Sequence, residues 1–154
     1  MMAKSDKEWE ELSRRIAQEV MSWKEWGALP EDARRKFWKV METQPDEYDL
    51  AFNRDKWWSV LESGCPDSEE DIVGWQPHNN VAQALMVLDR IAETYHYGHS
   101  IFLLASHLTR YRVLIWEGFG CVSMWQGEHT SRAKAICLAI EAWANANLDI
   151  TEKM

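Results

Sequence analysis

Four of the five histidines in the sequence are the candidates to bind a metal ion or to transfer a proton. They are His96, His99, His107 and His129. A catalytic zinc ion needs three protein ligands in a fixed geometry, but the sequence has neither a His-x-x-x-His motif nor a carboxylate at the spacing that such a motif requires. His96 and His99 span the expected end of a helix. We therefore expect no metal site and no cofactor, and we interpret these histidines as turn or strand-end residues.

Covalent catalysis would require a serine or cysteine nucleophile beside a general base. The sequence has no Gly-x-Ser-x-Gly motif, and residues 64–66 (GCP), which could expose a thiol, have no activating group nearby in the sequence. Residues 118–120 (GFG) lie between expected strands, so they are interpreted as a hairpin turn and not as a phosphate-binding loop. The sequence thus predicts no catalytic residue and favours a protein that is not an enzyme. A cryptic enzyme that uses His99, His107 or His129 is the third and lowest-ranked hypothesis.

Basic residues near the start of the last expected helix could bind an anion. Arg132 and Lys134 lie at the helix N-terminus, where backbone N–H groups and the helix dipole favour negative charge. Arg110 and Arg112 belong to the expected sheet. Together with stacking aromatic side chains, these four cations could hold a nucleotide signal. A protein that binds or sequesters such a small anionic ligand is the second hypothesis, although ordinary capping also explains the helix start.

Ten tryptophans in 154 residues are the most unusual feature of the composition. Tryptophan is enriched at protein interfaces, and its indole N–H seeks a partner when it is buried. Trp57 and Trp58 are adjacent, and adjacent residues of a helix point about 100° apart, so both could hardly enter one core. With Trp26 and Trp38 they lie in residues 24–74. We therefore expect this segment to form an interaction surface.

The formal net charge is −8, and the acidic excess lies in the first half of the chain. An acidic protein without a basic stripe binds nucleic acid poorly, because phosphate contacts need clustered Lys and Arg, so no nucleic-acid partner is expected. The charge favours a basic partner or an uncharged one. No apolar run approaches the roughly 20 residues of a membrane helix, so no membrane partner is expected. Three cysteines without CxxC spacing fit a cytoplasmic location.

Hydrophobic periodicity predicts the elements that must position these residues. Apolar side chains recur at helical spacing in five segments, which are 6–23, a segment beginning at 30–32, 53–62, 81–95 and 130–146. Ser5, Asn79 or Asn80, and Thr130 or Ser131 are the expected N-terminal caps. Gly98 is the expected residue at the C-terminal end of the fourth helix. Residues 63–74 are rich in Pro, Gly, Ser and acids, and are expected to form a loop.

Three further segments are apolar on both alternating faces. They are 100–105, 113–116 and 121–125. Strands of this kind need cover on both faces, and their short links favour an antiparallel meander. The predicted fold is therefore α+β, a three-stranded or larger antiparallel meander sheet covered by helices on both faces, or α-β-α sandwich. Residues 1–154 are expected to form a single domain, with 24–74 as a helical insertion or peripheral subdomain.

Four short stretches occur in an order that resembles a known family. They are residues 16–23 (IAQEVMSW), 75–80 (WQPHNN), 111–113 (YRV) and 130–139 (TSRAKAICLA). Their order resembles the phage ABA-sandwich domain, a small family encoded by bacteriophages and prophages. The resemblance covers residues 16–23 and 75–146 and skips 24–74. It implies an α-β-α sandwich and a phage origin, and it carries over no catalytic residues.

The leading functional hypothesis is a non-catalytic phage accessory protein that acts by binding. The missing catalytic motifs, the acidic Trp-rich segment and the family resemblance all favour it. Phages use small acidic proteins to block host defence, so the sharpest form is an inhibitor of a host defence component in the bacterial cytoplasm. This form rests on analogy and not on a site. The expected partner is a host protein, and the sequence does not set the oligomeric state.

Overall fold

The chain divides into two compact units. The computed structural model describes residues 4–40, 57–60, 72–104, 110–117 and 123–148. Unit 1 combines Met1–Ile16 with Gln76–Met154, and unit 2 is Ala17–Trp75. Unit 2 is therefore an insertion in the sequence of unit 1, and it contains the segment 24–74.

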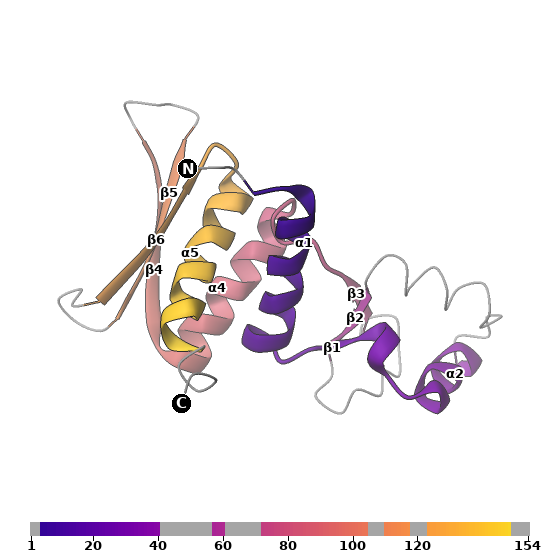
Figure 1. The fold of residues 1–154 in the computed structure, drawn as a ribbon. Helices are drawn as coiled ribbons and strands as arrows, with labels where there is room; N and C mark the ends of the chain where they lie inside the picture. The colour runs from indigo at the N-terminus through magenta and orange to yellow at the C-terminus, as the bar shows by residue number, and fades with distance from the viewer. Residues whose placement is uncertain (1–3, 41–56, 61–71, 105–109, 118–122, 149–154) are drawn as a thin grey trace. The chain divides into compact units, whose positions relative to one another are not determined.

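The described residues of unit 1 form three helices and a three-stranded antiparallel sheet, which can be followed in Figure 1. The elements are α1 (Asp6–Arg15), α4 (Val81–Tyr95), β4 (Tyr97–Leu103), β5 (Tyr111–Glu117), β6 (Ser123–His129) and α5 (Arg132–Asn147). The strand order is β4-β5-β6, and Tyr111 lies opposite both Leu103 and His129. The predicted α+β class and the antiparallel meander are confirmed, with strands of seven residues each.

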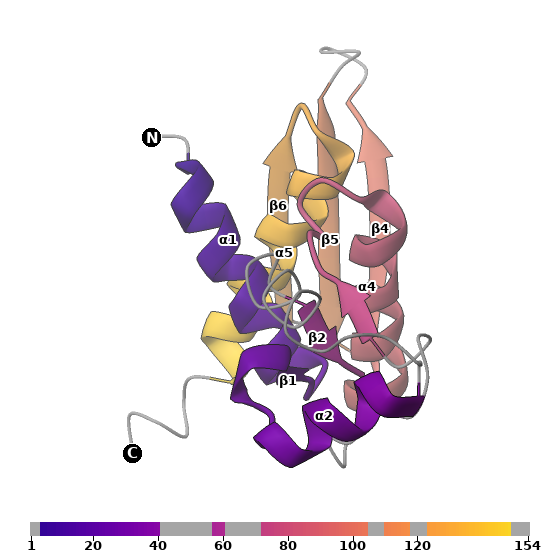
Figure 2. The same cartoon turned by 90° about the vertical axis from the view of Figure 1, so that its right-hand side faces the viewer.

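All three helices of unit 1 lie on the same side of its sheet (Figures 1 and 2). Val113 and Ile115 of β5 point to this side and are fully buried. Gly127 of β6 lets α5 approach closely, because a Cβ there would lie 2.3 Å from the carbonyl oxygen of Ala135. The expectation of helices on both faces is corrected here: the described residues of unit 1 supply one helical layer. The alternate side chains of the strands are apolar too, but no described helix of unit 1 covers them.

Polar side chains begin the helices of unit 1 as predicted. Ser5 forms a capping box at α1, and Asn80 and Ser131 accept backbone N–H bonds at the starts of α4 and α5. The predicted end of α4 at Gly98 is wrong. His96 ends the helix instead, in the left-handed conformation with φ 63°, which histidine adopts more readily than most residues. Gly98 lies inside β4.

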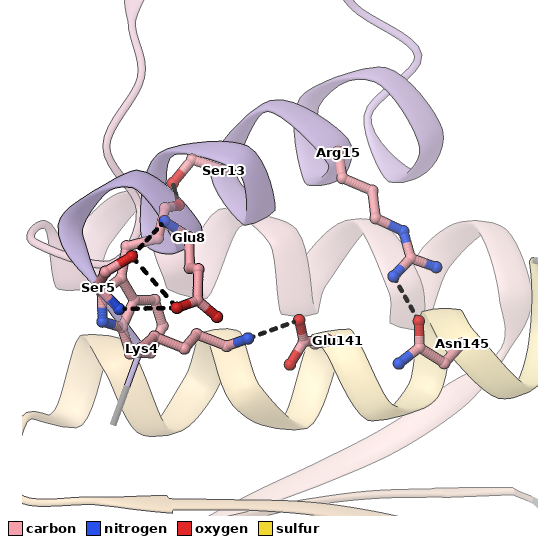
Figure 3. Close-up of polar contacts among 8 residues, drawn as sticks. Lys4, Ser5, Glu8, Ser13, Arg15, Glu141 and Asn145 are labelled. Atoms are coloured by element: carbon pink, nitrogen blue, oxygen red, sulfur yellow. Dashed lines mark hydrogen bonds and ion pairs between the residues drawn. The ribbon is translucent and has the colours of Figure 1, made fainter. Parts of the chain in front are cut away.

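Helix α1 is tied to α5 by polar bonds at both of its ends (Figure 3). Lys4 Nζ lies 3.0 Å from a carboxylate oxygen of Glu141, and Arg15 donates to the side-chain oxygen of Asn145. Of the predicted helix 6–23, residues Asp6–Arg15 form an α-helix. It continues as a π-helix over Ile16–Val20.

The described residues of unit 2 form one longer helix and a sheet of very short strands. The elements are β1 (Lys24–Glu25), the 3-10 helix η2 (Trp26–Ala28), α2 (Glu31–Val40), β2 (Trp57–Ser59) and β3 (Ile72–Gly74). The order β1-β2-β3 is antiparallel throughout. Helix α2 confirms the second predicted helix.

Two predictions for unit 2 are wrong at the residues that the structure describes. The helix expected at 53–62 is a strand at Trp57–Ser59, and the last three residues of the expected loop 63–74 form the strand β3. The other parts of these two predictions, 53–56 and 61–71, lie outside the described residues. Pairing of Trp58 with Val73 overrides the local helical pattern, because tertiary context outweighs propensity in short segments. None of the described helices combines the length and the apolar character needed to cross a lipid bilayer.

Candidate functional site

The tryptophans expected at an interaction surface form the core of unit 2. Trp26, Trp38 and Trp58 are buried. The ring centroid of Trp26 lies 5.2 Å from that of Phe37 and 5.6 Å from that of Trp38. Trp57 is half-buried and packs against the same cluster. The expectation is thus corrected for three of the four residues: in a unit with strands of two or three residues, large aromatic rings supply the buried apolar area.

The four candidate anion-binding residues do not converge on one point. Arg110 Nε lies 2.7 Å and Arg112 Nη2 3.3 Å from the carboxylate of Glu128, so a neighbouring side chain already binds both cations. Hydrogen bonding to Arg110 lowers the pKa of that carboxyl below its ordinary value. Arg132 is exposed at the first residue of α5. Lys134 lies instead over an aromatic ring on the helical side of the sheet.

That ring is Trp9, the centre of a cluster of polar side chains in unit 1. The imidazole of His78 stacks on it, with centroids 5.8 Å apart and planes inclined by 13°. His129 meets it edge-on at 6.0 Å. Lys134 Nζ and Lys4 Nζ lie 5.4 Å and 6.0 Å from its centroid, within the range of cation–π attraction. We call Trp9, Ser13, His78, His129, Lys134 and Lys4 the Trp9 cluster.

Hydrogen bonds assign different tautomers to the two imidazoles. Ser13 Oγ donates to the carbonyl of Trp9 at 2.9 Å and lies 2.8 Å from Nδ1 of His78, so Nδ1 carries the proton. Nδ1 of His129 instead accepts from the backbone N–H of Ser131 at 2.9 Å, which leaves the proton of the neutral ring on Nε2. Burial, and then the charge of Lys134, lowers the pKa of both histidines.

The pairing of Ser13 with His78 has the contact distance of a nucleophile and its base. Only 5% of Ser13 and 7% of His78 is exposed, however, so the hydroxyl is closed to a substrate. Ser13 also lies in the middle of α1 and bonds back one turn to Trp9. The contacts of Ser13 and Trp9 with His78 and His129 are therefore structural. They hold α1 against the start of α4 and the end of β6.

One feature of the sequence indicates this cluster, although hydrophobic periodicity does not detect it: a polar residue on the apolar face of a helix. Ser13 follows Trp9 by four residues and therefore lies on the apolar face of α1. A polar residue on a buried face needs a hydrogen-bond partner, because an unpaired buried hydroxyl is destabilising. His78 is the available partner, in the stretch 75–80, which is interpreted above only as a helix start and as part of the family resemblance. The relevant histidine was thus absent from the four candidates.

Of the three candidates that the structure describes, His129 alone joins the cluster. His96 ends α4, and His99 is half-buried in β4 opposite Ile115. His107, Cys65 and Cys121 lie outside the described residues. Among the described residues, no three histidine, cysteine or acidic side chains gather in the way a metal ion requires. Cys137 is buried, which raises the pKa of its thiol to about 12.

The second notable surface of unit 1 is the side of its sheet away from the helices, which we call the open face. Because side chains alternate along a strand, the residues next to buried Val113 and Ile115 point to this side. The open face consists of Gly98, Ser100 and Phe102 of β4, Arg112, Leu114 and Trp116 of β5, and Met124, Gln126 and Glu128 of β6.

An apolar stripe crosses the open face diagonally. It runs from Met124 through Trp116 and Leu114 to Phe102, as the strand register places them. Phe102 is 47% and Met124 48% exposed. The indole of Trp116 lies over Gly98, where a Cβ would come within 2.5 Å of the ring. The stripe therefore forms a continuous apolar surface beside the Arg110–Arg112–Glu128 ion pairs.

Comparison with known proteins adds no family to these observations. No family model, no curated protein and no solved structure matches the chain.

Proposed function

We propose that this chain acts by binding another protein through the open face. The supporting observation is the apolar stripe of unit 1, which ends in two half-exposed side chains, Phe102 and Met124. Burying apolar area of this kind stabilises a complex by roughly 25 cal/mol per Å² before the costs of association. The adjoining ion pairs hold two arginines and one glutamate, so a carboxylate of the partner fits beside Arg110.

The finer form of the proposal is an accessory protein of a phage that works in the cytoplasm of its bacterial host. The resemblance of residues 16–23 and 75–146 to the phage ABA-sandwich domain supports this origin. An inhibitor of a host defence component is the sharpest version, with a host protein as partner. Catalysis is not part of the proposal, because the Ser13–His78 pair favours a structural role.

The test places a photo-crosslinking amino acid at Gln126, an exposed residue of the open face, and exposes the full chain to bacterial lysate. A partner identified by mass spectrometry is then purified, and its dissociation constant is measured directly. Met124→Lys should weaken binding by about tenfold or more, equivalent to about 1.4 kcal/mol. Met86→Lys is the matched control, because Met86 is 44% exposed but lies on α4, on the helical side.

Equal loss of binding in both variants would argue for a general effect of charge and against the open face. A partner that crosslinks but binds Met124→Lys as tightly as the unmodified chain would place the contact elsewhere. Absence of any crosslinked protein from a lysate of the natural host would count against binding as the function.

A further inference from the structure

Strand β4 is an edge of the sheet of unit 1, and its outer backbone groups point away from that sheet. The N–H of Leu104 donates to the carbonyl of Arg110 at 2.9 Å, which fixes the phase of the ladder. In an antiparallel pair, residues alternate between bonding to the neighbour and pointing outward. The outward residues of β4 are therefore Tyr97, His99, Ile101 and Leu103. No hydrogen bond joins their backbone groups to another described residue.

This edge lacks the features that normally prevent pairing. Sheet edges are protected by charged side chains, proline, bulges or very short strands. Strand β4 has seven residues, YGHSIFL, with no Lys, Arg, Asp, Glu or Pro among them. It ends in two of the most exposed large apolar side chains of the described chain, Phe102 at 47% and Leu103 at 52%. The opposite edge, β6, carries the charged Glu128, which binds Arg112 of β5 and Arg110 just before β5.

We propose that β4 pairs with β4 of a second copy of this chain across a two-fold axis, which joins the two sheets into one of six strands. With the axis at Ser100, Tyr97 lies opposite Leu103 of the second copy, and His99 lies opposite Ile101. In this register, each of the seven residues of β4 lies opposite a residue of β4 in the second copy. It also sets outward-pointing residues opposite one another, so each such pair exchanges two backbone hydrogen bonds.

The same register brings apolar side chains together on both faces. On the open face, Phe102 lies opposite Gly98 of the second copy, beside the indole of Trp116 that covers that glycine. On the helical face, Leu103 meets Tyr97. No charged side chain of β4 faces another, because the strand has none. The half-exposed residues Phe102 and Leu103 are thus those that the pairing covers.

Charge distribution favours unit 1 as the place of self-association. Unit 1 holds 10 Lys/Arg and 11 Asp/Glu, a balance of −1, while unit 2 holds 7 and 14, a balance of −7. Association through unit 1 therefore meets little long-range repulsion, which is weakened further by physiological salt. A second copy fits this nearly neutral edge better than a strongly charged partner.

Pairing would also enlarge the open face to a size that suits a specific interface. Three strands of seven residues present roughly 330 Å² of flat area, at about 4.8 Å between strands and 3.3 Å per residue. A typical specific interface buries about 800 Å² on each partner. Two open faces joined edge to edge approach that area. The pairing does not depend on the proposed function, since it requires no other protein.

The register itself is tested by Ser100→Cys in the full chain. Across the axis, Ser100 meets itself in a pair that does not exchange hydrogen bonds, with Cα atoms about 4.5 Å apart. That distance suits a disulfide. Mild oxidation should yield a covalent dimer in which mass spectrometry finds residue 100 linked to residue 100. Gln126→Cys on β6 is the control and should not link to itself.

The association is measured by sedimentation or light scattering of the full chain over a range of concentrations. We expect a dimer with twice the mass of 18.1 kDa. Its dissociation constant should rise by about tenfold or more in Leu103→Lys and in His99→Pro. The proline removes one of the outward-pointing backbone N–H groups. Met124→Lys and Gln126→Pro, the matched changes on β6, should leave the dimer intact. Circular dichroism checks that each variant is folded.

A mass of 18.1 kDa at every concentration would overturn the proposal, and so would a dimer that is unaffected by the β4 variants. A dimer that resists Leu103→Lys but is lost in Met124→Lys would point to face-to-face packing instead. Failure of partner capture leaves these results unchanged. The two proposals can therefore fail separately.

Discussion

Units 1 and 2 reach a buried core by different means. In unit 1, strands of seven residues and the small residues of α5, such as Ala135 and Ala139, let a helix lie close to a sheet. In unit 2, strands of two or three residues leave little regular backbone pairing, and Trp26, Phe37 and Trp38 fill the interior. Large aromatic side chains can thus form a buried core where the strands are very short, because each ring buries about 150–250 Å² of surface.

The units also differ in charge, which bears on where partners dock. Unit 2 carries a balance of −7 and unit 1 of −1. The apolar stripe and the uncharged edge of β4 both belong to the nearly neutral unit. A contact through unit 1 can therefore depend on apolar burial and backbone pairing, while the charge of unit 2 opposes non-specific association of copies.

The substitution with the largest expected effect on stability tests whether the cores of units 1 and 2 unfold separately. Trp26→Ala removes a fully buried indole from the centre of unit 2 and should destabilise that unit by about 3–5 kcal/mol. Hydrogen exchange followed by mass spectrometry should then show faster exchange in residues 17–75. Protection in α5 and β5 should be retained, because these elements pack within unit 1 around Ile140 and Ile115.

The reciprocal change is Ile140→Ala, which opens a cavity in unit 1 and should cost about 2–5 kcal/mol. It should raise exchange in α5, β5 and β6 while unit 2 keeps its protection. If either variant raises exchange equally in both units, the chain unfolds as one cooperative body. The distinction between two separate cores would then be wrong for stability.

A second prediction concerns the close contact that distinguishes the sheet of unit 1. In Gly127→Ala, the new Cβ would lie 2.3 Å from backbone atoms of Ala135 and Ala139, so α5 must move away from β6. We expect a loss of roughly 3 kcal/mol, at the upper end for overpacking. The urea midpoint gives this value.

Gly98→Ala is the matched control on the open face. Its Cβ would clash with the ring of Trp116, a half-buried side chain that can rotate away, so we expect a smaller loss. If the two alanine variants are equally destabilised, the ring of Trp116 is held as rigidly as the backbone of α5. The open face would then be a fixed surface and not an adaptable one.

The sequence predicted unit 1 far better than unit 2, for a physical reason. Residues that alternate as Val113 and Ile115 do, or recur at helical spacing as in α4, carry a periodic signal that long elements average over many positions. Strands of three residues such as Trp57–Ser59 give no period to detect. Their conformation depends on pairing with Val73, which is distant in the sequence.

Local sequence patterns also do not predict which face of the sheet the helices cover. Apolar residues on both faces, such as Val113 and Leu114, predict cover on both, but the described helices of unit 1 cover only the face of Val113. Burial of tryptophan was misjudged for a related reason. Composition shows that Trp26 and Trp38 are unusual, whereas only the tertiary fold shows that they face each other.

A third prediction exploits the fact that all five histidines of the sequence belong to unit 1. Burial keeps the pKa of His78 and His129 below the ordinary value of 6.5. The unfolded chain then binds protons that the native state does not, so stability is complete above pH 6.5 and falls as the pH drops through 6.5 toward the folded pKa. The loss should be a fraction of the Gly127→Ala effect.

The measurement is the urea midpoint between pH 7.5 and pH 5.5, with hydrogen exchange to locate the change. Acidification over this range should raise exchange in α1 and α5 and spare α2, because unit 2 has no histidine. In His78→Gln, the dependence on pH should become shallower. A profile that is the same in this variant and in the unmodified chain would show that His78 does not contribute to the pH dependence.

The smallest expected difference compares one ion pair from each unit. Lys4 and Glu141 join α1 to α5, and 21% and 27% of their side chains are exposed. Arg35 and Glu31 lie one turn apart on α2, with 69% and 65% exposed. A double-mutant cycle with Lys4→Met and Glu141→Gln should give a coupling of about 0.5–1 kcal/mol, against about 0.3–0.5 kcal/mol for the α2 pair.

The reason is solvent screening, which weakens an exposed pair more than a partly buried one. Adding 0.5 M salt should therefore reduce the α2 coupling by the larger fraction. A Lys4–Glu141 coupling near zero would mean that this ion pair does not hold α1 in place, and that the bond of Arg15 to Asn145 and the contacts of Trp9, Ser13 and His78 do so instead. Lys4→Met would then leave the exchange protection of α1 unchanged, whereas Ser13→Ala would lower it.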